Sequence, residues 1–153
     1  MSDPSLDSAT IGEIGEFALL DRLWAVLSED EIQRTERVEV PSGDDAAVVR
    51  PTPGHSIVLT TDVQIAGRHF LPAWTPARAL GHRAMTVNLS DLAAMGARPT
   101  FALVSAGLRA DQTLREVTEI QRGFLDALRG RDSVVRGSPP SAAAQAPLSL
   151  IHI

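Results

Sequence analysis

The chain has 153 residues, 44% of them hydrophobic and 22% charged, with a formal net charge of -5 and a pI near 5.3. This composition is typical of one soluble globular domain, and its acidity excludes bare nucleic acid and anionic membranes as partners, because both need a basic face. With no cysteine, a disulfide framework, a zinc-thiolate site and a thiol nucleophile are excluded. All 14 basic residues are arginine, so the chain lacks the lysine that a P-loop protein or a protein kinase needs on its nucleotide.

The first ten residues carry Asp3 and Asp7 and no basic residue, whereas a signal peptide starts with positive charge and continues into an apolar stretch. No window approaches the roughly 18 consecutive apolar residues of a membrane span. We therefore predict a cytoplasmic protein with no membrane partner.

Residues 1–13 are predicted to be a flexible leader, and the domain is predicted to run from residue 14 to residue 136. A helix follows the leader, and we expect its apolar stripe to pack in the core. The stripe consists of Phe17, Leu20, Trp24 and Leu27.

From residue 37 the pattern becomes typical of strands. Val38 and Val40 alternate with charge, residues 46–49 are extended, and residues 57–59 form a third short strand, with turns between them. This pattern predicts a meander of strands whose ends carry acidic residues.

The second half of the chain alternates helix and strand. Thr75 and Pro76 suit a helix start, and apolar spacing through Leu80, Ala84 and Val87 extends the helix to about Met95. Residues 101–108 are predicted to be a buried strand that leads into another helix. The buried face of that helix is expected to carry Leu114, Val117, Phe124 and Leu128. Strands followed by alternating helices and strands predict an α/β or α+β fold.

The tail, residues 137–153, differs in composition from the rest, since no Asp, Glu, Lys or Arg follows Arg136. A natural low-complexity linker is one interpretation. The last six residues, Leu-Ser-Leu-Ile-His-Ile, are also the in-frame translation of CTGTCTCTTATACACATC, which looks like the transposase end used in sequencing libraries. We therefore expect the tail to be non-native.

Two polar clusters lie at strand ends. Gly43-Asp44-Asp45-Ala46 by itself is typical of a plain turn, and a magnesium site is the less favoured interpretation, because Mg²⁺ also binds through carboxylates. Thr60-Thr61-Asp62 supplies two hydroxyls and a carboxylate, although threonine is also simply a good strand residue. Both interpretations stay open for each cluster.

Two single residues are further candidates. Asp91 has Val87 and Met95 as helical neighbours, so it is predicted on or beside an apolar face, where a carboxylate needs an arginine partner, a raised pKa or a metal. Arg83 and Arg98 are the possible ion-pair partners. His69 follows a Gly-Arg pair in a loop, where a lone histidine is more often structural than catalytic.

In chain order the motifs are Gly15-Glu16-Phe17, Gly43-Asp44-Asp45-Ala46-Ala47-Val48, Thr60-Thr61-Asp62, Gly67-Arg68-His69-Phe70 and the run of residues 87–97, VNLSDLAAMGA. This succession resembles the thiamine-phosphate kinases, within the superfamily of aminoimidazole-ribonucleotide synthetase-like ATP-binding enzymes. The last two motifs are the specific ones, and the resemblance covers about residues 14–128.

The resemblance implies a transferase that uses ATP and Mg²⁺ to phosphorylate thiamine phosphate to thiamine diphosphate. The implied fold is a mixed β-sheet flanked by helices, whose sheet pairs with that of a second subunit in a homodimer, and a second α/β domain follows. His69 matches the substrate contact. The residues that match the family's magnesium ligands are Asp45, Thr60, Thr61, Asp62 and Asp91.

The chain departs from the family after the helix that ends near Leu128. The family continues into Gly-Gly-Asp-Thr, a nucleotide- and metal-binding motif, whereas this chain has Gly137-Ser138-Pro139, and Asp132 lies too early to replace the aspartate. The C-terminal domain of the family is also missing. We therefore expect a truncated fragment with little or no kinase activity.

Two alternatives remain. Within the superfamily, a hydrogenase-maturation or purine-cyclising enzyme shares the Gly-Asp-Asp motif and the use of ATP with magnesium. In a different class, the chain is a non-catalytic dimerisation module, because a single N-terminal domain still offers its sheet for pairing.

Overall fold

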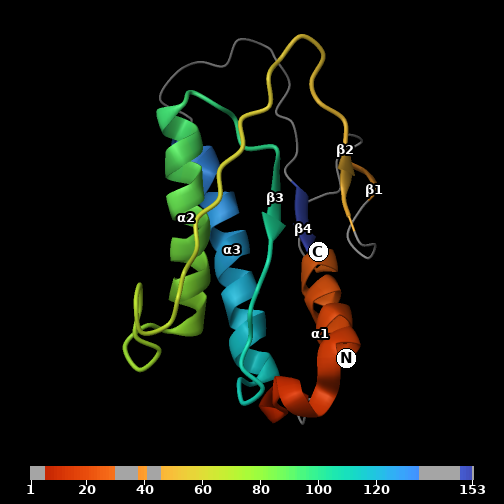
Figure 1. Ribbon diagram of the computed structural model, residues 1–153, viewed down its shortest axis with the longest axis vertical. Helices are drawn as coiled ribbons and strands as arrows, with labels where there is room; N and C mark the ends of the chain where they lie inside the picture. Colours follow the sequence, from red (N-terminus) through yellow and green to blue (C-terminus); the bar gives the residue numbers. More distant parts are fainter. Residues whose placement is uncertain (1–5, 30–37, 41–45, 135–148, 153) are drawn as a thin grey trace.

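The computed structural model describes residues 6–29, 38–40, 46–134 and 149–152. The helices are η1 (Leu6–Ser8), α1 (Ile11–Ser28), α2 (Ala77–Ala94) and α3 (Leu114–Val134), and the strands are β1 (Val38–Val40), β2 (Val48–Val49), β3 (Phe101–Val104) and β4 (Ser149–His152). Helices α2 and α3 lie side by side, and α1 packs on α3 through a separate apolar cluster (Figure 1). The mixture of helices and strands agrees with the predicted α/β class.

The strands form two small sheets in the described part of the chain. β1 and β2 pair antiparallel with an irregularity between Val38 and Val40, and β3 and β4 pair parallel, with Phe101 opposite Ser149. The single mixed sheet of the prediction is not seen among these residues. Residues 57–59, predicted to be a strand, form none, because a strand needs a neighbour for its backbone hydrogen bonds and no ladder partner lies beside them in the described chain.

Residues 6–13 belong to the predicted flexible leader, yet they lie in η1 and in the first turn of α1. Thr10 and Glu13 form a capping box in which the Glu13 carboxylate accepts from the Thr10 backbone N–H at 2.8 Å. The Ile11 and Gly12 N–H groups donate to the Gln112 and Ala110 carbonyls. These bonds tie the start of α1 to the loop before α3.

The buried face of α1 differs from the predicted stripe. Gly15 has φ = 76°, a left-handed conformation that glycine adopts without penalty, and it kinks the helix. Beyond the kink the buried residues are Leu19, Leu23 and Val26, whereas Phe17 is 83% exposed. The prediction for Phe17 was wrong, because α3 covers the face of Leu19, Leu23 and Val26, which is displaced by one residue from the predicted stripe.

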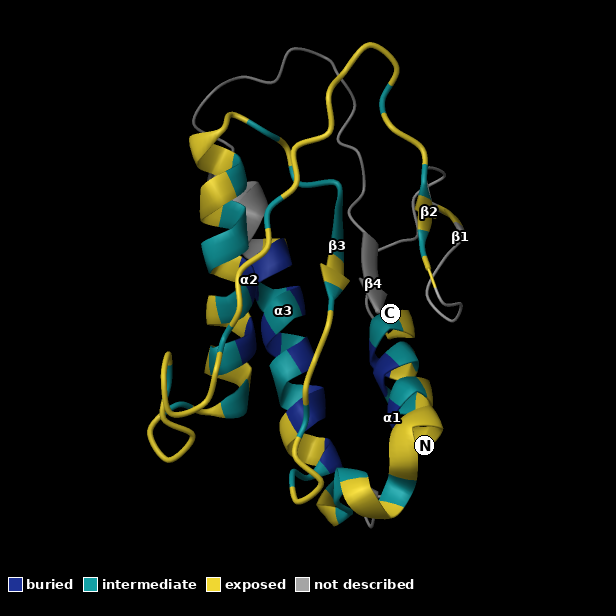
Figure 2. Cartoon of the chain, viewed as in Figure 1, coloured by how far each residue is buried: buried dark blue, intermediate teal, exposed yellow. Residues whose placement is uncertain are grey.

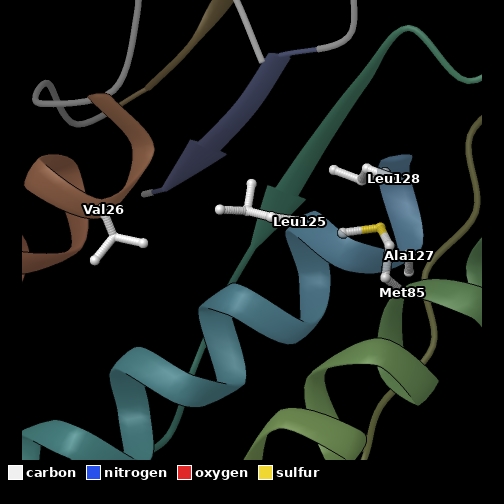
Figure 3. Packing of buried hydrophobic residues seen from close by; sticks show 5 residues of the cluster. All are labelled: Val26, Met85, Leu125, Ala127 and Leu128. Carbon is white, nitrogen blue, oxygen red and sulfur yellow. The ribbon is translucent and has the colours of Figure 1, made fainter. Parts of the chain in front are cut away.

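The main hydrophobic core packs around α3. One buried cluster joins Val26 of α1 and Met85 of α2 to Leu125, Ala127 and Leu128 of α3 (Figure 3). Buried residues recur along α3 from its first turn, whereas residues 50–76, which lead into α2, are largely exposed (Figure 2). The predicted apolar face of α3 is confirmed, with Leu114, Val117 and Leu128 buried and Phe124 partly buried.

Two glycines allow α2 and α3 to approach closely. A Cβ atom on Gly81 would overlap the Ile120 carbonyl oxygen, and one on Gly123 would overlap the Arg78 carbonyl oxygen. Gly81 and Met85 are therefore the buried residues of α2, while the predicted Leu80, Ala84 and Val87 are only half-buried. At each of these two contacts a glycine of one helix lies directly against the backbone of the other.

An ion pair joins the same two helices. The Arg78 guanidinium donates two hydrogen bonds to the Asp126 carboxylate, at 2.6 Å and 3.1 Å, and Arg129 adds a third at 3.3 Å. The hydrogen bonds from Arg78, together with the charges of Arg78 and Arg129, lower the pKa of Asp126, against a smaller raising effect of burial. The carboxylate is therefore held in its ionised form.

Because of this ion pair, the free energy of unfolding should depend on pH. Because the pKa of Asp126 is lower in the folded than in the unfolded chain, its contribution is present above the unfolded value of about 4 and is lost as the pH falls through the folded value. We expect Asp126→Asn to lower the free energy of unfolding by about 1 kcal/mol at neutral pH, in urea titrations followed by circular dichroism. The difference from wild type should shrink in acid below about pH 4. A difference that stays constant with pH would contradict this account.

The described helices include none that is long and apolar enough to cross a membrane.

Residues 149–152 belong to the segment that we expected to be a non-native tail, and here they form β4 along one edge of β3. An exposed strand edge presents unpaired N–H and C=O groups, so a β-prone segment readily pairs with it.

Candidate metal and substrate site

Residues 57–70 run alongside α2, and we call this line of contact the α2 seam (Figure 1). Near one end, the Thr60 hydroxyl donates to Oδ2 of Asp91 at 3.0 Å. Near the other end, Arg83 of α2 donates through Nη1 to the His69 carbonyl oxygen at 2.9 Å. The segment and the helix are therefore antiparallel, and the two contacts lie about 12 Å apart along the helix axis.

The surroundings of Asp91 differ from the prediction. Its side chain is exposed, so it does not lie on the buried face of α2, which carries Gly81 and Met85. The close contact between α2 and α3 turns that face toward α3 and leaves Asp91 facing away from it. Arg83, one of the two expected ion-pair partners, contacts the His69 loop instead. Asp91 therefore has a hydroxyl partner, and the argument from the cost of burial was wrong.

The contact between Thr60 and Asp91 is an ordinary hydrogen bond. The hydroxyl and carboxylate oxygen atoms are 3.0 Å apart, within the usual range of an O–H···O bond. Both are oxygen groups of the kind that Mg²⁺ prefers, so the contact places two of the predicted ligands side by side.

The remaining predicted ligands are Thr61, Asp62 and Asp45. Thr61 and Asp62 are exposed and follow Thr60 directly. Asp45 and its neighbour Asp44 lie outside the described residues. Within the described ranges no three His, Cys, Asp or Glu side chains come together as a metal cluster. The structure thus joins Thr60 to Asp91, 31 positions later, and does not test the remaining set.

His69 lies in a closed loop, residues 65–70, at the other end of the seam. The His69 and Arg68 N–H groups both donate to the Ile65 carbonyl, at 2.9 Å and 3.1 Å, and the Gly67 N–H donates to the Phe70 carbonyl at 2.8 Å. Gly67 has φ = 76°, which glycine tolerates and other residues rarely adopt. The imidazole closes the loop, because its Nδ1 accepts from the Ile65 N–H at 3.0 Å.

From the sequence, Arg83 was predicted only as a possible ion-pair partner for Asp91. Its hydrogen bond to the His69 carbonyl oxygen was not predicted. Arg83 and His69 are 14 residues apart, and a contact between a loop and a helix at this separation produces no periodic pattern in the sequence. Only its position on the same helix as Asp91, two turns earlier, could have indicated that one helix face carries both contacts.

The described α/β domain thus aligns the Thr60–Asp91 contact and the His69 loop along α2. The chain belongs to the family described as AIR synthase related protein, N-terminal domain, which matches residues 43–137.

The chain is also similar to curated proteins named thiamine-monophosphate kinase. It is 36% identical to that of Synechococcus elongatus over 150 residues, which are 98% of this chain and 41% of the relative. It is 34% identical to that of Corynebacterium glutamicum over 123 residues, 80% of this chain and 34% of the relative. For the Escherichia coli K12 protein the identity is 38% over 94 residues, 61% and 27% of the two chains. The chain thus spans less than half the length of these relatives.

Proposed function

We propose that this chain is the N-terminal part of an enzyme that transfers a phosphoryl group from ATP to thiamine phosphate, giving thiamine diphosphate and ADP. The family match and the names of the relatives support the reaction class. The observation that carries the proposal is the Thr60–Asp91 contact, because it brings oxygen groups of two separate motifs together. We place the enzyme in the cytoplasm, where ATP is available.

The proposed metal ligands are Asp45, Thr60, Thr61, Asp62 and Asp91. Magnesium, when bound, would neutralise the negative charge of the phosphates, a role that needs no lysine. The carboxylates and hydroxyls of this chain position the ion, and His69 binds the thiamine phosphate. The attacking group is a phosphate oxygen that is already ionised at neutral pH, so no residue of the chain has to act as a general base.

A homodimer is part of the same proposal. Five large apolar side chains between residues 57 and 65 are exposed: Ile57, Val58, Leu59, Val63 and Ile65. Leu59 is the most exposed of them, at 76%. These exposed apolar side chains support pairing with a second copy, and they also favour the alternative that the chain is a non-catalytic dimerisation module.

A titration separates the two functions. For a polypeptide of residues 1–153 we expect calorimetry to detect ATP binding in the presence of Mg²⁺ and to lose it when EDTA is added, because the chain binds the phosphates through the metal. Size exclusion under the same conditions reports the dimer. A dimer that shows no response to ATP and Mg²⁺ would favour the dimerisation module and contradict the proposed site.

Turnover distinguishes the kinase from the related enzymes. We expect the full-length protein that contains this chain to release ADP with thiamine phosphate, and not with the substrates of hydrogenase-maturation or purine-cyclising enzymes. The polypeptide 1–153 should release little, because it covers only 41% of the Synechococcus elongatus relative. Robust turnover by residues 1–153 alone would refute the second expectation.

A further inference from the structure

The hydrogen bonds of the His69 loop determine which ring nitrogen carries the proton. The Ile65 backbone N–H can only donate, so Nδ1 of His69 must present its lone pair to it. In the neutral ring the proton is therefore on Nε2. His69 is exposed, and Nε2 has no hydrogen-bond partner among the described residues.

The loop that fixes this ring is itself attached to α2 at one point. Arg83 donates to the carbonyl oxygen of His69, the residue whose side chain closes the loop. Because Arg83 is on a helix packed against α3, it links the His69 backbone to the rigid part of the fold. Arg68, the neighbour of His69, is also an arginine and is exposed, but its side chain makes no hydrogen bond within the described residues.

We propose that Arg83 is a positioning residue: it holds the loop of residues 65–70 on α2 so that His69 offers Nε2–H as a hydrogen-bond donor to a phosphate oxygen of the substrate. This inference rests on the proposed function for the identity of the substrate. The tautomer and its dependence on Arg83 do not rest on it. A neutral imidazole with a fixed donor selects an ionised phosphate oxygen, which accepts hydrogen bonds but cannot donate them.

The tautomer is measured in the chain of 153 residues by two-bond ¹H–¹⁵N correlation spectra in slightly alkaline buffer, with the signals of His69 assigned by their loss in His69→Gln. We expect the Nε2–H form in the wild type. Arg83→Met removes the donor and should give a mixture of tautomers, whereas Arg83→Lys keeps a donor and should retain the wild-type form. Arg68→Met is the matched control, because it removes the same charge from a residue next to His69 that does not hold the loop on α2, and it should leave the tautomer unchanged.

Kinetics of the full-length protein test the link to the substrate. Losing one charge-assisted positioning contact should raise KM for thiamine phosphate about tenfold in Arg83→Met, with partial recovery in Arg83→Lys. The value of kcat should change by less than about threefold, since Arg83 touches no reacting atom. Circular dichroism checks the folding of each variant, and Arg83→Leu, which also lacks a donor, replaces Arg83→Met if the latter does not fold.

The outcomes are distinguishable. A wild-type His69 in the Nδ1–H form, or a tautomer that is the same in Arg83→Met and wild type, would overturn the positioning role. A shift of the tautomer in Arg83→Met without a change in KM would overturn the role of His69 toward the substrate, while the link between Arg83 and the loop would stand. Equal effects of Arg83→Met and Arg68→Met would reduce the role of Arg83 to its charge and overturn the proposal.

Discussion

The variant Gly123→Ala should lose at least about 3 kcal/mol of its free energy of unfolding, and its Tm should fall by about 10 °C. The added Cβ would overlap the Arg78 carbonyl oxygen and lie 2.6 Å from the His82 backbone nitrogen. Both are backbone atoms of α2, so no side chain can move aside, and the two helices would have to separate. Thermal unfolding followed by circular dichroism at 222 nm, a wavelength that reports helix, measures the effect.

Gly81→Ala should behave in the same way, because its Cβ would overlap the Ile120 carbonyl oxygen on the opposite helix. Gly107→Ala is the matched control, since a Cβ at position 107 meets nothing within 4 Å. It should change stability by less than about 1 kcal/mol. If Gly123→Ala and Gly107→Ala unfold at the same temperature, the close backbone contact between α2 and α3 does not contribute to stability.

Asp91→Asn in a full-length protein containing this chain should lower magnesium-dependent turnover by at least about 100-fold, because changing a residue that only hydrogen-bonds to a metal ligand already costs about 10- to 100-fold. The substitution keeps the size of the side chain and an oxygen that can accept from Thr60, and it removes the charge that binds the cation. Raising the Mg²⁺ concentration should recover part of the rate. The measurement is ADP release as a function of Mg²⁺ at saturating ATP and thiamine phosphate.

Asp111→Asn is the control for Asp91→Asn. It also removes one exposed carboxylate, but Asp111 pairs with Arg109 in the loop before α3 and takes no part in the α2 seam. Its rate and Mg²⁺ dependence should match those of the wild type. A near-wild-type rate for Asp91→Asn, with an unchanged Mg²⁺ dependence, would remove Asp91 from the metal site.

Much of the secondary structure followed from local patterns. The spacing of apolar residues and a Thr-Pro start predicted α2 to within about one residue at each end, and the apolar face of α3 was predicted correctly. Val38 and Val40 were placed in a strand, which the structure confirms. These features depend on residues close together in sequence, whose helical or extended periodicity is visible without the fold.

The buried faces of α1 and α2 could not be predicted in the same way. Both helices carry apolar residues at adjacent positions, such as Leu19 and Leu20, so the hydrophobic pattern does not choose between neighbouring faces. In α2 the choice depends on Gly81, which has no hydrophobic side chain and therefore gives no signal in the pattern. Because the face of α2 that carries Gly81 packs against α3, Asp91 is exposed and does not lie beside an apolar surface as predicted.

The sequence by itself determined the kinds of residue available for chemistry: oxygen ligands, a histidine after Gly-Arg, and arginine as the sole cationic side chain. It also determined the family resemblance, which the comparisons confirm. Only the tertiary structure decided that Thr60 contacts Asp91 and that Arg83 contacts His69. The physical reason is that both contacts join an extended segment to a helix whose rotation is set by two glycines, and that rotation depends on residues distant in sequence.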